Sequence, residues 1–351
     1  MRWLSRLVAR ASTRFGDESG VTIIFIAVVL LGLLAMTAFV IDFGRIWQER
    51  RELQTGATAA ALAVAEDCAR DLCDAAGYSE NDVAKLYADA NATDGVAAIH
   101  GIALDLSGQT VEVVTATEEP DGSGSMDMFF ARIIGFDTIT VGAGATVEWG
   151  YPTEGVTIPL IFSECEWLSD ELGNPGENPD SLPDSGNLID ATMVTIEFHA
   201  ALSDDTECTT HPGLDLPGGW GWLDTDIGCT NTVTLGQWEN LQTGNSTPGQ
   251  CGAADFQAML GEVVLIPYYD ETIATGNKQY KIAGFSPFFV TGYRFISSAY
   301  SGFLPPYWTT PPCSAPTTCL SGYFVSDVDN GGTGGPLGGS DRGFTVIQLI
   351  G

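Results

Sequence analysis

Residues 21–41 read VTIIFIAVVLLGLLAMTAFVI, a run of twenty-one residues without a charge that only Thr22, Gly32 and Thr37 interrupt. At about 1.5 Å per residue, a helix of this length crosses the roughly 30 Å hydrocarbon core of a membrane. A buried helix of a soluble protein is the alternative, but the length, the lack of charge and the flanking arginines favour a membrane span. The sequence therefore predicts a transmembrane anchor at residues 21–41.

The apolar run lacks the features of a cleaved secretory signal. Such a signal has an apolar region of about 7 to 15 residues, followed by small residues at positions −3 and −1 of the cut. Here the run is longer, and the residues that close it, Ala35-Met36-Thr37-Ala38, place Met at the −3 position. We therefore expect an uncleaved signal anchor.

The anchor divides the charge of the chain unequally. The net charge is −31, yet residues 1–51 hold seven of the 14 basic side chains against four acids, which leaves −34 on residues 52–351. So acidic a surface repels nucleic acid and excludes it as a partner. The 44% hydrophobic content argues against a wholly disordered chain. We expect a cytoplasmic N-terminus and an extracytoplasmic C-terminal domain at the cytoplasmic membrane.

The first twenty residues form a basic tail. Four arginines recur at every fourth position while apolar residues fill another face, a pattern typical of an amphipathic helix. Such a helix on the cytoplasmic leaflet gains about 1 kcal/mol per arginine from anionic lipid. A disordered basic tail is the alternative. In either case the predicted contacts with the membrane surface are Arg2, Arg6, Arg10 and Arg14.

All cysteines lie after the anchor, and their even number favours disulfides. They are Cys68, Cys73, Cys165, Cys208, Cys229, Cys251, Cys313 and Cys319. A zinc site is the alternative, but the only close pair of Cys and His is Cys208 with His211, a weak signal. Connectivity stays open, although proximity favours Cys313 with Cys319. We expect no metal and no cofactor.

Residues 42–150 combine helix and strand signals. No proline occurs from Asp42 to Asp67, and the alanine-rich run 57–65 has high helix propensity. Alternating apolar residues then predict strands at 102–106, 111–115, 126–134 and 139–149. We predict an α+β region in which the transmembrane helix continues into a long helix, followed by an antiparallel sheet.

Four motifs follow one another in the N-terminal part of the chain: GVTIIF at residue 20, IDFGR at residue 41, RRELQ at residue 50 and the alanine run after it. In this order they resemble the anchor segment of the TadE/TadG-like proteins of the tight-adherence (Flp) pilus assembly system. Residues 129–141, with 143–147, also resemble the closing helix and strand of that family's ectodomain. Residues 266–270 and 280–294 resemble the C-terminal part of longer TadG-related proteins. The resemblance implies a pilin-like anchor that supports assembly of an adhesive fibre, with other Tad assembly proteins and pilin-like subunits as partners.

The chain departs from the pilin pattern at one position. Pilins of this broad class are cut after a glycine and carry Glu at the fifth mature position. A cut after Gly20 places Phe25 there, and a cut after Gly16 places Val21 there. A carboxylate in the bilayer costs about 2.5 to 3.5 kcal/mol, so pilins keep it for a purpose. Its absence argues against a major fibre subunit, and we expect no processing at Gly20.

Residues 151–351 are predicted to form a separate, disulfide-stapled, β-rich extracytoplasmic domain. Short strand signals at 192–199, 262–267, 281–293 and 345–350 are bounded by turn residues. Two long loops, 173–186 and 326–343, are candidates for recognition. The run Asp327-Val-Asp329-Asn330-Gly331 has carboxylates spaced for calcium, but Gly331 stands where an EF-hand loop needs a ligand.

Motifs of catalysis are missing from the sequence. It has no H-E-x-x-H zinc helix, no G-x-S-x-G serine and no phosphate loop. We therefore expect a non-enzymatic component of the Flp/Tad apparatus, similar to a minor pseudopilin. The alternatives are a free-standing adhesin on a TadG-like anchor and an extracytoplasmic hydrolase. The aromatic clusters around Trp222 and Tyr307 could form a ligand surface or fill a protein core, and core packing is the favoured interpretation.

Overall fold

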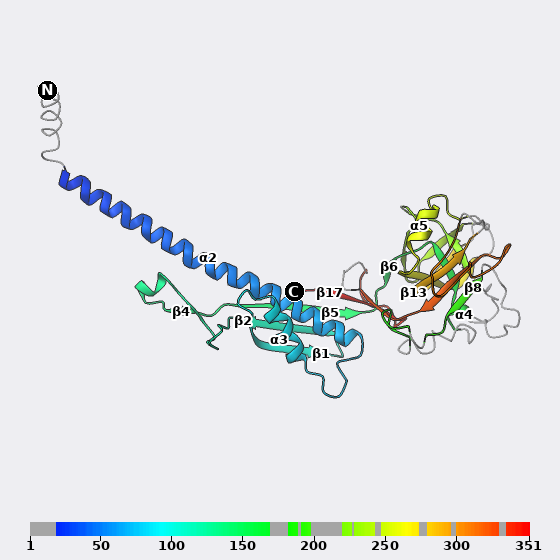
Figure 1. The fold of residues 1–351 in the computed structure, drawn as a ribbon, viewed down its shortest axis with the longest axis horizontal. Coiled ribbons are helices and arrows are strands. Elements are labelled where there is room, and N and C mark those ends of the chain that lie inside the picture. Colours follow the sequence, from blue (N-terminus) through cyan, green and yellow to red (C-terminus); the bar gives the residue numbers. More distant parts are fainter. Residues whose placement is uncertain are drawn as a thin grey trace, which may run out of the picture.

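We describe the fold from a computed structural model of the 351-residue chain. The described residues are 19–168, 182–188, 191–197, 220–226, 228–242, 247–273, 279–295, 300–329 and 335–351. They form an α+β fold with one long helix, a five-stranded sheet packed on it and a larger β-rich body at the far end (Figure 1). The four tail arginines and Cys208 lie outside the described residues.

Helix α2 (Ser19–Ala69) is a single rod of 51 residues. As predicted, the anchor continues without a break into the alanine-rich helix, because no proline interrupts the segment and its glycines are widely spaced. Its first part stands free of the rest of the protein, whereas its second part lies on the sheet (Figure 1). A short turn then leads to α3 (Glu80–Ala90), whose first turn is capped by Ser79.

The second part of α2 packs through small side chains. Residues at helical spacing are buried there: Leu53, Ala57, Ala60, Ala61, Val64, Ala65 and Cys68. They meet Ala84 of α3 and the inward side chains of the sheet, among them Val111, Val147 and Ile347. Gly56 allows a close approach, since a Cβ there would lie 3.3 Å from the carbonyl oxygen of Ala88. We call this buried, mostly alanine surface of α2 the alanine stripe. Its small side chains let helix and sheet lie close together.

The sheet beneath α2 has the strand order β1-β2-β5-β17-β16. Strands β1 (Ala98–Asp105), β2 (Thr110–Ala116) and β5 (Gly142–Gly150) are antiparallel neighbours, in agreement with the sequence prediction. The C-terminal strand β17 (Phe344–Leu349) pairs antiparallel with β5, and β16 (Asp327–Asp329) is parallel to β17. The sheet thus draws strands from both sides of the boundary expected at residue 151.

One strand prediction is wrong. Alternation predicts a strand over residues 126–134, but only β3 (Met126–Asp127) is extended, and the 3-10 helix η1 (Ala131–Ile134) follows. The helical turn agrees instead with the closing helix that the family resemblance implies after residue 129. Strand β3 pairs with the equally short β4 (Thr138–Ile139). We call residues 126–139 the arm; Figure 1 shows it, labelled β4, beside α2 and pointing back toward the N-terminal end.

The larger body is built on an eight-stranded sheet, with core strands β7 (Leu160–Ser163), β12 (Val263–Ile273), β13 (Gln279–Arg294) and β15 (Cys319–Phe324). Strand β11 (Trp238–Gln242) pairs with both β9 (Trp220–Leu223) and β13, so the strands β11, β9, β7, β12 and β13 close into a ring. The remaining described elements are β6 (Glu154–Thr157), α4 (Glu164–Trp167), β8 (Val194–Glu197), β10 (Asn231–Thr234), α5 (Ala253–Ala258) and β14 (Ser301–Phe303).

Aromatic side chains fill the core of this body. Trp222 is buried against Phe256 and Phe295, with ring centroids 5.8 Å and 5.0 Å away. Trp167 stacks on Tyr268 at 5.5 Å. These contacts place Trp222 in the core rather than on a ligand surface. On the other face of the sheet, Phe344 and Val346 of β17 join a second cluster, which ties the body to the smaller sheet.

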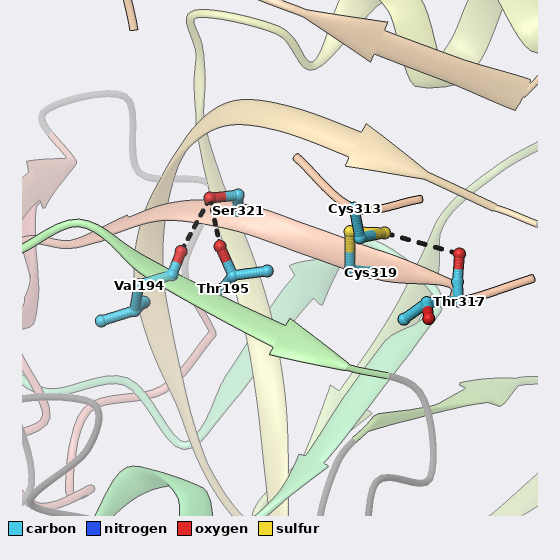
Figure 2. Close-up of a disulfide and its surroundings, with 6 residues drawn as sticks. All are labelled: Val194, Thr195, Cys313, Thr317, Cys319 and Ser321. Carbon is cyan, nitrogen blue, oxygen red and sulfur yellow. Dashed lines mark hydrogen bonds between the residues drawn. A yellow bond between two sulfur atoms is a disulfide. The ribbon is translucent and has the colours of Figure 1, made fainter. Parts of the chain in front are cut away.

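Three disulfides join described cysteines: Cys68–Cys73, Cys229–Cys251 and Cys313–Cys319. The last one fastens the start of β15, where Ser321 donates to the carbonyl of Val194 in β8 at 2.9 Å (Figure 2). Cys313 Sγ lies 3.5 Å from the carbonyl oxygen of Thr317, a contact without a hydrogen because the sulfur is oxidised. Two of these disulfides staple the larger body.

Removing the disulfides of the larger body should destabilise it unequally. Chain-entropy arithmetic gives about 3 kcal/mol for the loop closed by Cys229–Cys251 and about 2 kcal/mol for that of Cys313–Cys319, whose separations are 22 and 6 residues. We expect the Cys229→Ser/Cys251→Ser variant to unfold at lower denaturant concentration than the Cys313→Ser/Cys319→Ser variant. Denaturant titration of both against the parent protein checks the order, and an inverted order would contradict it.

Candidate functional site: the anchor helix and its arm

The N-terminal part of α2 presents apolar side chains on every side. Its large hydrophobic residues from Ile23 to Ile41 are exposed in the described protein, and the apolar window of the helix has none of its residues buried. By length and composition α2 can cross a membrane, and among the described helices it alone meets that test. A helix that is apolar on all sides has no polar face to expose to water, so lipid or other membrane helices are the surroundings that suit it.

Asp42 marks the point where this exposed part ends. Its side chain is only 5% exposed, and its two carboxylate oxygens accept hydrogen bonds from three consecutive backbone amides of the arm. The distances are 3.1 Å from Phe129, 3.0 Å from Phe130 and 2.7 Å from Ala131. These amides begin the 3-10 helix η1 and have no partner within it, so Asp42 acts as a cap supplied by another helix.

Arg45 fastens the arm a second time, one turn farther along α2. Its Nη1 donates to the carbonyl of Asp127 at 2.7 Å, and its guanidinium lies 4.7 Å from the centre of the Phe129 ring. The two contacts combine a charged hydrogen bond with a cation–π interaction. Together, Asp42 and Arg45 hold both ends of the segment 127–131 against the helix.

An apolar groove of about 390 Å³ lies between the arm and α2. Its helix wall is formed by residues 35–46, including Ala35, Ala38 and Phe39, and its arm wall by Phe130, Ala131 and Ile133. The groove therefore extends below Asp42, into the part of α2 with the composition of a membrane span. The small alanines on the helix side leave the room that the groove occupies.

A polar cavity of about 260 Å³ lies where the C-terminal end of α2 meets the larger body. Arg70 pairs there with Glu66 and with Asp184. Ser185 donates to Asp327 at 2.9 Å. Burial raises the pKa of the Asp327 carboxyl above its usual range, although the hydrogen bond from Ser185 and the charge of Arg70 act in the opposite direction. These contacts join the C-terminal end of α2 to the larger body.

The structure describes some of the predicted site residues and leaves others outside the described ranges. Six of the eight cysteines form the three disulfides described above; Cys208 and the four tail arginines lie outside the described residues, and the side chain of Cys165 is also not described. Within the described ranges, no group of three or more His, Cys, Asp and Glu side chains is placed to hold a metal ion. The clamp of Asp42 and Arg45 on the arm was not anticipated. The sequence offered one sign of it: the motif IDFGR places an acid, Asp42, and a base, Arg45, directly after the span.

The N-terminus of the mature protein gives a test of processing. Because Phe25 stands where the fifth mature residue of a pilin carries Glu, we expect no cut after Gly20. N-terminal sequencing of the full-length protein extracted from membranes should therefore find no chain that starts at Val21. A mature start at Val21 would refute this expectation.

The anchor helix is similar to a described protein family. Residues 20–67 match the family model of putative Flp pilus-assembly TadE/G-like proteins. No curated protein and no solved structure matches the chain. The matched segment coincides with α2 and includes both Asp42 and Arg45. The anchor helix, with the stripe that packs on the sheet, is thus similar to the TadE/G-like family over residues 20–67.

Proposed function

We propose that the protein is a membrane-anchored, non-enzymatic component of Flp/Tad pilus assembly, similar to a minor pseudopilin. The observation that carries this proposal is the TadE/G-like match at residues 20–67, which falls on a helix that is apolar and exposed in its first part and packed on a sheet in its second. Pilin-like subunits have this architecture: one helix serves as both membrane anchor and spine of the ectodomain.

We propose that the N-terminus is cytoplasmic and that residues 42–351 are extracytoplasmic. The charge division supports this orientation, since arginines gather before the span while residues after position 51 carry −34. The disulfides support it as well, because they persist in an oxidising compartment and all lie after the span. The four tail arginines would then face the anionic inner leaflet.

The partners that we propose are membrane lipid, other Tad assembly proteins and pilin-like subunits. Photo-crosslinking in cells from Phe25 and Leu31, two exposed anchor positions, tests the protein partners. We expect crosslinks to the membrane-embedded assembly proteins of the Tad apparatus. Leu106 in the ectodomain is the matched control, because it is exposed but lies beyond the anchor. Anchor crosslinks that reach only unrelated membrane proteins would overturn the proposal.

A further inference from the structure

We propose that the tip of the arm, residues 128–136, inserts into the outer leaflet of the membrane beside α2 and forms a second membrane contact. The inference depends on α2 spanning the membrane as proposed above, but not on the role in pilus assembly. It concerns lipid as the occupant of the surface, and it rests on the exposed side chains, the depth and the backbone hydrogen bonds of the tip.

The tip exposes large apolar side chains in an otherwise acidic protein. Phe129 is 66% exposed, Ile133 81% and Phe136 65%. The nine residues, MFFARIIGF, contain a single charge, on Arg132. The guanidinium of Arg132 reaches back to Asp127 at 3.3 Å and to Asp137 at 3.6 Å, the two residues that border the tip. The side chain thus carries its charge away from the apolar end, as arginines do at membrane surfaces.

The depth of the tip follows from the groove that it shares with α2. A helix of twenty-one residues is about 31 Å long, so residues 21–41 fill the hydrocarbon core and Ile41 stands near its outer boundary. Ile133 lines the same groove as Ala35 and Ala38. Since Ala35 lies six residues before Ile41, the groove reaches about 9 Å below that boundary. The tip therefore lies at the same depth in the membrane as the outer part of the span.

Most backbone amides of the tip donate hydrogen bonds to acceptors within the protein, as an apolar environment requires. A non-helical segment enters a membrane only where its amides find acceptors in the protein. Asp42 accepts from residues 129–131, and carbonyls within the arm accept from the amides of Met128, Ile133, Gly135 and Phe136. Gly135 makes the closing turn possible, because its φ of 93° is unfavourable for other residues.

Lipid suits this surface better than a second transmembrane helix. Helices that pack in membranes meet through small residues, which allow their backbones to approach closely. The outward side chains of the tip are instead large, as in segments that lie in the membrane interface. They also continue the exposed apolar surface of α2, which already faces lipid in the proposed arrangement.

Spin labelling of the full-length protein in phosphatidylcholine/phosphatidylglycerol vesicles tests the proposal. We choose Ile133→Cys and Phe136→Cys for the tip, Leu31→Cys for the span and Leu106→Cys for the distal ectodomain. The parent protein, treated with the label without reductant, corrects for reaction of native cysteines. Accessibility to oxygen, which partitions into lipid, is compared with accessibility to a water-soluble nickel complex.

We expect the labels at 133 and 136 to resemble the one at 31, with at least a threefold preference for oxygen over nickel, and the label at 106 to show the reverse. Preference for nickel at both tip positions, with position 31 still in lipid, would overturn the proposal and leave the anchor intact. Protection from both reagents would indicate a protein partner and overturn it as well. Should one tip variant fail to fold by circular dichroism, the other gives the result.

Discussion

Replacing Asp42 by Ala should release the arm from α2. Three backbone amides lose their acceptor, and a hydrogen bond to a charged group is worth about 1.5 to 3 kcal/mol. Because these bonds share one carboxylate, we expect a combined loss of about 3 kcal/mol, which raises the open population of the arm about 150-fold and speeds amide exchange by the same factor. Hydrogen exchange of the full-length protein in detergent micelles measures this at residues 129–131.

The Asp42→Ala prediction has a matched control elsewhere in the chain. Asp105 also accepts backbone amides, those of Ser107 and Gly108, but in the distal turn between β1 and β2. Asp105→Ala should therefore speed exchange in that turn and leave the arm unchanged. Asp42→Asn, which keeps one oxygen acceptor, should give an intermediate effect. Unchanged exchange at residues 129–131 in Asp42→Ala would show that the clamp does not hold the arm.

Placing a charge in the alanine stripe should have the largest effect on the stability of the folded region after the anchor. Ala61 is fully buried in the cluster that α2 shares with α3 and the five-stranded sheet. Ala61→Asp buries a carboxylate among apolar side chains, at a cost of about 3 to 5 kcal/mol. We expect the thermal midpoint to fall by about 10 °C, at roughly 2 to 4 °C per kcal/mol. Trp149, in the same cluster, reports the transition through its fluorescence.

Ala59→Asp is the control for this substitution. It introduces the same residue into the same helix two positions earlier, where the side chain is only half-buried. Both variants should still insert into membranes, because the span before Asp42 is unchanged. If Ala61→Asp were no more destabilising than Ala59→Asp, the stripe would not be the surface that joins α2 to the sheet.

The anchor and its helical continuation were predictable because their signals are local. A charge-free run of sufficient length identifies a span in isolation, and the alanine-rich segment without proline indicates a helix on its own. The strands β1, β2 and β5 were likewise visible in the alternation of their side chains. The place of β17 could not be predicted, because its position beside β5 depends on a pairing between residues about 200 positions apart.

The arm shows most clearly why part of the site escaped prediction. Alternation in the segment 126–134 favours a strand, but the carboxylate of Asp42 stabilises a 3-10 turn there from 87 residues away in sequence. Short-range reasoning has no access to that partner. The same holds for the disulfides: Cys313 and Cys319 are neighbours in sequence, whereas nothing local distinguishes Cys251 as the partner of Cys229.

We propose that the protein takes part in building Flp fibres and does not bind surfaces on its own. Surface fibres are counted by electron microscopy in cells that lack the gene and in cells complemented with it. We expect fibres to disappear on deletion and to return on complementation. Normal fibres on cells that lack the protein, together with a loss of surface attachment, would instead identify a free-standing adhesin.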